Sequence, residues 1–318
     1  MKETDETVAE ESNEELSTLK ESLRQALDSG NMQRAGEIKE EMLPHLEAVK
    51  DKIMLPPERA KEIMGEDFFG QEALEKTFGT TLEKADIPRI PFTEKELERA
   101  KAYDCYLILR TGQLPTGEKL TMRNMGMMLG EKWEKNNFGR VLYDKNRDED
   151  TKADYFLSET PRPGWALFRK SPLIDTKGVN YVQQTGRILE FLKEDLYRGM
   201  PPPDDLLQAD EEYNAKIWQI LRGGTMDIEK ATELKANQKY RQTPVEFLYD
   251  EAVFMSNKLG DKIYLGKSVL TNRYRVDDSG VRRMVEVSSP SGTGMRIKSD
   301  STGYYNNSDL GASFTIVK

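Results

Sequence analysis

The chain has 318 residues, of which 37% are hydrophobic and 32% are charged, and its formal net charge is −9. This length suits one large domain or two ordinary ones. A single cysteine, Cys105, excludes an internal disulfide framework and a cysteine-based zinc site, and a single histidine, His45, leaves little room for histidine-centred catalysis.

The expected compartment and partner classes follow from composition. No stretch approaches the roughly 20 apolar residues that a membrane span needs. The first residues contain no apolar segment typical of a secretory signal. We therefore expect a cytoplasmic protein that does not associate with membranes. The chain is acidic and has no block of five basic residues, so we expect no nucleic-acid partner.

The charge is unevenly distributed along the chain. Residues 1–55 contain 7 Lys/Arg and 14 Asp/Glu, whereas residues 255–318 contain 10 Lys/Arg and 6 Asp/Glu. The mildly basic C-terminal end is suited to an acidic partner. The alternative is that these charges are scattered over the surface and only keep the protein in solution.

The N-terminal region has helical periodicity. Residues 1–14 are acidic or small and polar, and we expect them to be disordered because they cannot bury enough apolar surface. Apolar residues at helical spacing over 16–27 and again over 35–53 predict two amphipathic helices, separated by a break at Gly30. Pro44 lies inside the second stripe and predicts a kink or a restart.

Residues 15–92 are therefore interpreted as a helical hairpin followed by a linker. Two prolines in residues 87–92 require an extended conformation there. Residues 93–318 are interpreted as an α+β domain, so the fold class is α+β with a helical N-terminal region. In this domain the sequence predicts strands over 105–109 and 165–168, and helices over 94–102, 121–129, 181–197, 205–222, 227–240 and 244–258.

The pattern changes to strands in residues 260–318. Glycine and serine become frequent, and apolar residues alternate with polar ones over 281–287, 295–298 and 312–316. This alternation is typical of short, half-buried antiparallel strands that are separated by polar turns. The chain is thus expected to begin with helices and to end in a small β-rich unit.

No residue pattern predicts a catalytic centre, a metal site or a cofactor. Cys105 lies within an apolar run, which is typical of an inert buried thiol. His45 follows Pro44 on an acidic helix, where a surface position is expected. Gly266 and the lysine after it lack the glycine that a phosphate-binding loop needs five residues earlier, because that position is Asp261.

Four stretches resemble a family of uncharacterised bacterial proteins. They are residues 90–100, 107–110, 160–167 and 241–246. The resemblance covers most of residues 57–318. It implies a shared architecture and carries no established activity.

A second resemblance concerns the C-terminal end. Residues 270–273, residues 285–287 and residues 308–314 resemble the end of a C-type-lectin-like domain. They are most similar to the variable proteins of diversity-generating retroelements and to related sulfatase-modifying-type modules. The resemblance implies that a first strand, over residues 105–110, pairs with the final strand, over residues 311–317, with two helices between them.

In such variable domains, Tyr, Asn, Ser, Asp and Arg side chains are displayed on a rigid scaffold. Tyrosine offers a large contact area at a low cost in conformational entropy, and Asn and Ser offer adaptable hydrogen bonds. Two segments here have this composition, and a polar turn with two half-buried tyrosines is the alternative interpretation. The candidate ligand-binding residues are Asn272, Arg273, Tyr274, Arg275, Tyr304, Tyr305, Asn306, Asn307 and Ser308.

The sequence therefore favours a recognition protein that binds a protein or another macromolecular ligand through its C-terminal surface. Two alternatives remain. One is an assembly or scaffold protein that associates with itself through the N-terminal helices. The other is an enzyme of unidentified class; the sulfatase-modifying branch implies oxidative chemistry, but the only thiol, Cys105, lies in an expected strand.

Overall fold

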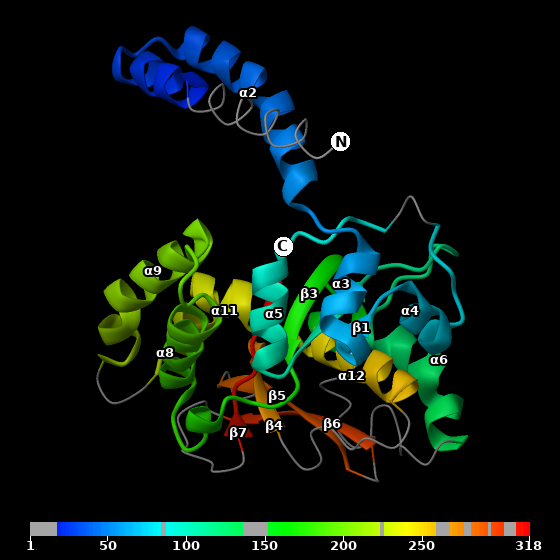
Figure 1. Ribbon diagram of the computed structural model, residues 1–318. Helices are drawn as coiled ribbons and strands as arrows, with labels where there is room; N and C mark the ends of the chain where they lie inside the picture. Colours follow the sequence, from blue (N-terminus) through cyan, green and yellow to red (C-terminus); the bar gives the residue numbers. More distant parts are fainter. Residues whose placement is uncertain are drawn as a thin grey trace. The chain divides into compact units, whose positions relative to one another are not determined.

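The computed structural model contains helices throughout and strands in two sheets (Figure 1), which confirms the predicted α+β class. Its contacts divide the chain into two compact units, which are described separately. Unit 1 is formed by Met1–Arg59 and Arg89–Thr93, and unit 2 by Ala60–Pro88 and Glu94–Lys318. The structure describes residues 18–83, 87–135, 152–222, 226–258, 268–276, 281–291, 294–301 and 310–318.

Unit 1 contains the predicted helical hairpin. A helix over residues 18–28 is followed by Gly30, whose φ of +70° favours glycine, and then by α2 (Met32–Ile53). The Asn31 side chain accepts a hydrogen bond from the Arg34 N–H at 3.1 Å and so caps α2. The core of this hairpin is small: Leu19, Leu23, Ala26, Ala35, Ile38 and Met42.

Two details of unit 1 concern the proline predictions. Of the kink or restart predicted at Pro44, the restart does not occur, because α2 is a single helix from Met32 to Ile53. Proline removes one N–H from the hydrogen-bond ladder, and the remaining turns hold the helix together. The linker around residue 90 is extended as predicted. Leu55 and Ile90 form an antiparallel bridge with N–H···O distances of 2.9 and 3.0 Å.

The first sheet of unit 2 contains β1 (Phe68–Phe69), β2 (Cys105–Arg110), β3 (Gly164–Arg169) and β8 (Thr315–Val317), in the order β1-β2-β3-β8. The predicted strands over 105–109 and 165–168 are confirmed. All six residues of β2 are buried. A strand that is covered on both faces needs a continuous apolar run, which explains why this segment shows no alternation.

The expected pairing of the first strand with the final strand is wrong. Strand β8 pairs antiparallel with β3, through Ala166 and Val317, Leu167 and Ile316, and Phe168 and Thr315. Both edges of β2 are already occupied, by β1 on one side and by β3 on the other. The final strand therefore cannot pair with β2, and it joins this sheet at the other edge of β3.

All the helices predicted within residues 93–318 are present, and residues 154–157 form a further helix where a polar loop was expected. Residues 227–240 form two helices, because Leu234 is extended (φ −51°, ψ 134°) and interrupts the helical backbone. Helix α8 ends in a π-helical turn over Leu192–Leu196. The helices are α3 (Pro57–Met64), α4 (Gln71–Phe78), α5 (Glu94–Ala102), α6 (Met122–Lys135), α7 (Asp154–Leu157), α8 (Tyr181–Phe191), α9 (Asp204–Ile220), α10 (Ile228–Glu233), α11 (Lys235–Tyr240) and α12 (Pro244–Asn257).

Helix α12 is the central helix of unit 2. All of its residues are buried except Met255 and Asn257. It begins with a capping box, in which Thr243 and Glu246 exchange hydrogen bonds of 3.0 and 3.1 Å, and with a proline at the first helical position. Because α12 also carries Glu246, Asp250 and Glu251, its burial places three carboxyl groups in the interior.

The second sheet is formed by β4 (Ser268–Val276), β5 (Arg282–Ser291), β6 (Gly294–Ser301) and β7 (Leu310–Gly311), in the order β6-β5-β4-β7. Strands β5 and β6 pair antiparallel, as predicted, and β4 pairs antiparallel with β5, with a register shift in β4 between Leu270 and Tyr274. Residues 284–287 and 312–316 are buried on both faces, so the half-buried alternation expected over 281–287 and 312–316 is wrong.

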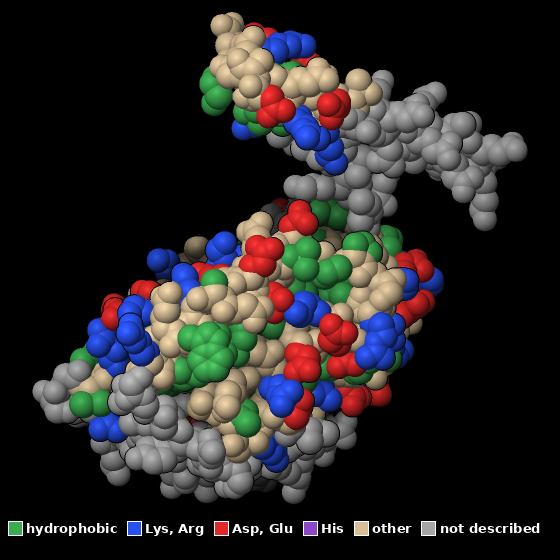
Figure 2. Space-filling model, turned by 90° about the vertical axis from the view of Figure 1, so that its left-hand side faces the viewer, with side chains coloured by type: hydrophobic (Ala, Val, Ile, Leu, Met, Phe, Trp, Pro, Cys, Tyr) green, Lys and Arg blue, Asp and Glu red, His purple; other side chains and the backbone are tan. Residues whose placement is uncertain are grey.

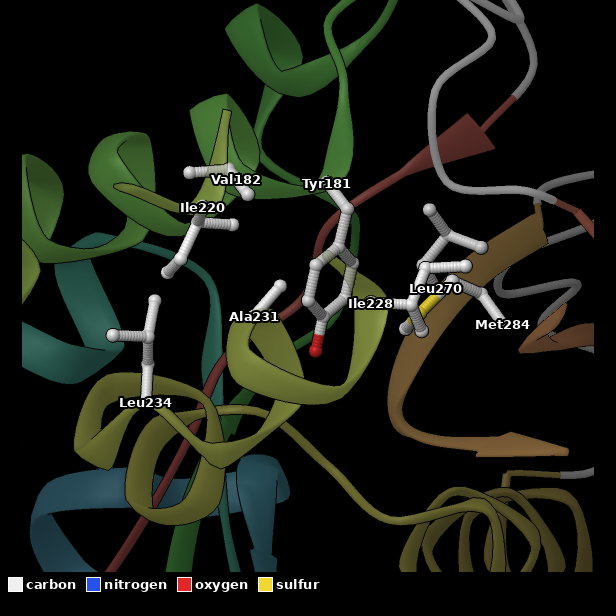
Figure 3. Packing of buried hydrophobic residues seen from close by; sticks show 8 residues of the cluster. All are labelled: Tyr181, Val182, Ile220, Ile228, Ala231, Leu234, Leu270 and Met284. Carbon is white, nitrogen blue, oxygen red and sulfur yellow. The ribbon is translucent and has the colours of Figure 1, made fainter. Parts of the chain in front are cut away.

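A hydrophobic cluster holds α9 against the rest of unit 2. Figure 3 shows Ile220 at the end of α9 beside Val182 of α8 and Leu234 at the end of α10. Tyr213 and Ile217 of α9 also pack against this cluster. The inward face of α9 is therefore fixed along its C-terminal half, which leaves its opposite face toward solvent.

Candidate functional site

The structure describes four of the nine residues predicted to bind a ligand, and they lie in β4. Asn272 is buried; its N–H donates to the Gln242 carbonyl at 3.2 Å, and within the described chain its side-chain Oδ1 has no hydrogen-bond partner. Arg275 is half-buried and lies opposite Arg283 of β5. The other five residues, Tyr304, Tyr305, Asn306, Asn307 and Ser308, lie outside the described residues, as do Gly266 and Asp261.

Arg273 and Tyr274 make contacts within unit 2. Arg273 Nε donates to Glu159 Oε1 at 2.7 Å. The Tyr274 hydroxyl donates to Glu229 Oε1 at 3.2 Å, and the same carboxylate accepts from Arg282 at 2.6 Å. These contacts connect β4 and β5 to α10 and to the segment after α7, and they give both side chains a structural role.

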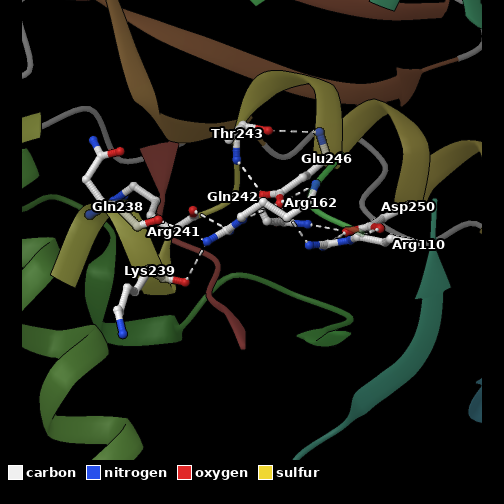
Figure 4. A network of polar contacts seen from close by, with 9 residues as sticks. All are labelled: Arg110, Arg162, Gln238, Lys239, Arg241, Gln242, Thr243, Glu246 and Asp250. Atoms are coloured by element: carbon white, nitrogen blue, oxygen red, sulfur yellow. Dashed lines mark hydrogen bonds and ion pairs between the residues drawn. The ribbon is translucent and has the colours of Figure 1, made fainter. Parts of the chain in front are cut away.

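Sequence reasoning missed a buried ionic network around α12, which Figure 4 shows. At the end of β2, Arg110 Nε donates to Asp250 Oδ1 at 2.9 Å, and Arg110 Nη1 lies 3.2 Å from Glu246 Oε1. Gln242 donates to the Asp250 carboxylate at 2.7 Å. Arg110, Glu246 and Asp250 are all buried. Buried charges are costly unless they are paired, and here each of them lies close to an opposite charge.

Arg162 joins the same network to the end of α11. Its Nε and Nη2 bind the Glu246 carboxylate at 2.5 and 2.9 Å, and its Nη1 donates to the carbonyls of Gln238 and Lys239 at 2.9 and 3.1 Å. A cation at a helix C-terminus and a carboxylate in a first helical turn both complement the helix dipoles. The arrangement fixes the turn between α11 and α12.

The pKa values in this network follow from the balance of burial and ion pairing. Burial raises the pKa of the Asp250 carboxyl, against the attraction of Arg110. For Glu246, burial is outweighed by Arg110 and Arg162, together with the Thr243 N–H, which lower its pKa to about 2. Glu246 therefore stays ionised in the folded protein even under acidic conditions.

Arg241 lies at the centre of a second buried network of hydrogen bonds, which contains no carboxylate. Its guanidinium donates to Asn237 Oδ1 and the Leu270 carbonyl at 3.1 Å, to Gln184 Oε1 and Thr185 Oγ1 at 3.3 Å, and to the Tyr181 carbonyl at 3.4 Å. It also lies 4.2 Å from the centre of the Tyr181 ring. All five donors are thus used to connect α8, α11 and β4.

Glu251 differs from the other carboxyl groups of α12. It is 2% exposed, and its Oε2 has no hydrogen-bond partner in the part of the chain that the structure describes. Burial and the neighbouring Asp250 raise the pKa of Glu251 well above its ordinary value. Burial therefore favours the neutral form of this carboxyl over its ionised form in the folded protein.

The residues considered for catalysis show no reactive arrangement among the described positions. Cys105 is buried, and burial raises the pKa of its thiol to about 12, which makes the thiolate scarce. The His45 side chain lies outside the described residues. Among the described residues, no group of three His, Cys, Asp or Glu side chains could hold a metal ion, and no helix is long and apolar enough to cross a membrane.

An exposed stripe on α9 is the other feature that sequence reasoning missed. Trp218 is 80% exposed, and Leu207, three turns earlier, is also exposed. We define the α9 stripe as the exposed residues Asp204, Leu207, Glu211, Asn214, Ala215 and Trp218. Figure 2 views unit 2 from the α9 side, where hydrophobic side chains lie at the surface among acidic and basic ones.

The sequence contains a signal for this stripe. The residues of α9 that pack inward include Leu206, Ala209, Ile217 and Ile220, at helical spacing, and Trp218 falls outside that series. An apolar residue out of phase with the buried face of a helix is expected at the surface.

Searches against protein-family models, curated proteins and solved structures returned no match to this chain. The residues of the chain are therefore the basis for a functional proposal.

Proposed function

We propose that this chain is a protein-binding protein whose contact surface is the α9 stripe. The observation that carries the proposal is the exposure of Trp218 on a well-packed helix. A tryptophan side chain left in water forgoes the free energy of burying a large apolar surface. Tryptophan is also among the residues that contribute most to binding energy at protein interfaces.

Helix α9 is held firmly by the rest of unit 2, which makes it suitable for recognition. Its inward face packs against the cluster of Figure 3, and ion pairs connect its acidic side chains to neighbouring helices. Asp205 binds Lys239 of α11 at 2.9 Å, and Asp210 binds Lys193 at 2.6 Å. A rigid helix loses little conformational entropy when a partner binds, which favours affinity.

In-cell photo-cross-linking tests this proposal. Trp218 is replaced by the photo-cross-linking amino acid benzoylphenylalanine, which keeps a large aromatic side chain at this position, and the same amino acid replaces the exposed Glu75 of α4, on the opposite side of unit 2 in Figure 1. We expect a protein adduct of defined mass from position 218 and none from position 75. Equal adducts at both positions, or none at position 218, would contradict the proposal.

The C-terminal surface predicted from the sequence is a second location for the same function. Its support is the exposure of Val276 and Val281 at one end of β4 and β5, beside the half-buried Tyr274. A Tyr274→Ala substitution separates the two roles of that residue. Lost binding with an unchanged thermal midpoint favours recognition, whereas a large loss of stability favours the structural role.

Assembly through the N-terminal helices is the other candidate function, and the composition of the hairpin favours it. The core of unit 1 contains few large side chains, and Met32 is 71% exposed. Short helices are marginally stable alone and gain stability when their apolar faces are covered. Light scattering of the full chain tests this function: an oligomer that a Met32→Lys substitution dissociates supports it, and a monomer of the unsubstituted chain contradicts it.

A further inference from the structure

The spacing of the α9 stripe is that of a helix-pairing surface. Leu207, Glu211, Asn214 and Trp218 follow one another at intervals of four, three and four residues. This alternation is the spacing of the residues at the seam of a coiled coil. At 1.5 Å per residue the seam from Leu207 to Trp218 extends over about 16 Å, or three helical turns.

The charge of the stripe is negative, and it is not balanced within α9. The helix contains five acidic residues and one lysine. Three of the acidic residues form ion pairs, namely Asp205 with Lys239, Asp210 with Lys193 and Glu212 with Lys216. The other two, Asp204 and Glu211, belong to the stripe and form no ion pair with the residues that the structure describes.

We propose that the α9 stripe binds a basic amphipathic helix of a partner protein. This inference rests on the proposed function and specifies the chemistry of the partner. Apolar side chains of the partner pack against Leu207 and Trp218, and its Lys or Arg side chains pair with Glu211 and Asp204. A cation next to Trp218 also gains a cation–π contact.

The same charges argue against other occupants. An anionic membrane or a nucleic acid would bring phosphate groups against Glu211 and Asp204. A second copy of the chain would bring a second pair of the same carboxylates to the seam. Like charges that face each other across an interface reduce affinity, and a basic helix is the partner that avoids this.

The chain contains a natural probe for this surface. Of its three tryptophans, Trp133 and Trp165 are buried and Trp218 is exposed. A water-soluble quencher therefore acts mainly on the emission of Trp218. A partner that covers the α9 stripe protects that emission and shifts it to shorter wavelength.

The experiment uses the full chain and synthetic peptides of 14 residues that contain no tryptophan or tyrosine. One peptide is a helix with leucine at seam positions and arginine beside them. A second has glutamate in place of each arginine, and a third has the first composition in scrambled order. We expect protection of Trp218 by the first peptide alone, with an affinity that falls as salt is added.

Variants locate the binding. We expect Glu211→Gln to weaken binding about two- to fivefold, because an exposed ion pair contributes little, and Leu207→Ser to weaken it further. Trp218→Ala is measured by calorimetry and should lose most of the affinity. The control, Glu75→Gln on α4, should bind as the unsubstituted chain does. Thermal midpoints show that each variant is folded.

Several results would overturn the inference. Equal binding of the basic, acidic and scrambled peptides would show that charge does not select the partner. Absence of binding by all three peptides would also contradict the inference. Protection of Trp218 by lipid vesicles would indicate a membrane surface, and protection that grows with protein concentration alone would indicate a second copy. Protein adducts at position 218 without binding of the basic peptide would leave the proposed function standing and refute this inference.

Discussion

Replacing Glu251 with glutamine should remove a loss in the stability of unit 2 that occurs as pH rises above the ordinary pKa of glutamate. The carboxyl is buried, its Oε2 lacks a hydrogen-bond partner in the described chain, and its pKa is raised well above the ordinary value by burial and by Asp250. The folded state therefore holds its proton to a higher pH than the unfolded chain, in which the group ionises near the ordinary glutamate pKa of about 4.3. The unfolded state therefore gains stability as pH rises.

The magnitude follows from this difference in protonation. Above a pH of about 4.3 the unfolded chain has released one proton that the folded chain keeps. The free energy of unfolding of the unsubstituted chain then falls by about 1.4 kcal/mol per pH unit relative to a variant that cannot titrate at this position. For each pH unit, the stability of the Glu251→Gln variant should therefore rise by about 1.4 kcal/mol relative to the unsubstituted chain, until the Glu251 carboxyl ionises in the folded protein.

Denaturant unfolding at several pH values above about 4.3 measures this effect, because the folded state holds the proton to a higher pH than the unfolded chain does. Tryptophan fluorescence is a suitable signal, because all three tryptophans lie in unit 2. Glu75→Gln, at an exposed position of α4, is the matched control and should leave the pH profile unchanged. Parallel profiles for the unsubstituted chain and the Glu251→Gln variant would refute the reasoning, because they would show that Glu251 has the same pKa in both states.

Three further predictions concern the other buried groups. The pKa of Glu246 is lowered to about 2 in the folded protein. Its ionised carboxylate therefore contributes about 3 kcal/mol to the free energy of unfolding above the unfolded pKa of about 4.3, and this contribution is lost as pH falls from about 4.3 to 2. Acid unfolding of a Glu246→Gln variant should lack this part of the pH dependence. An Arg241→Lys variant should lose roughly 2–4 kcal/mol in denaturant unfolding, because one ammonium cannot reach five acceptors and each buried unpaired acceptor is costly; an unchanged midpoint would contradict the geometry. Cys105, whose thiol pKa is raised to about 12 by burial, should react with a thiol reagent under mildly alkaline conditions only after denaturant is added, and fast labelling of the native protein would show that the thiol is accessible.

The secondary structure was largely predictable, because it is recorded in local patterns. The apolar run of β2, the capping residues Thr243 and Glu246 of α12, and the alternation in β5 each act over a few residues. The pairing of β8 with β3 was not predictable in this way. It depends on which strand edges remain free after the rest of the sheet has formed, and that is a property of the whole fold.

The buried network was hidden for a related reason. Arg110 and Asp250 are 140 positions apart, and nothing local marks either side chain as buried. Among 56 acidic residues, the three on α12 could be distinguished only once the burial of that helix was known. Trp218 was accessible to sequence reasoning, because its phase on α9 differs from that of the inward residues, but the surfaces predicted from the sequence were the C-terminal strands and turns and the N-terminal helices.

The position of β8 has a consequence for the order of events during synthesis. Residues 315–317 form an edge of the first sheet, whose other strands come from residues 68–69, 105–110 and 164–169. While a ribosome is still making the long segment between β3 and β8, the outer edge of β3 has unpaired N–H and C=O groups. Such an edge is a template for pairing with another chain. The nascent protein is therefore exposed to misassembly for much of the time of its translation, and a chaperone that covers β3 would act in this interval.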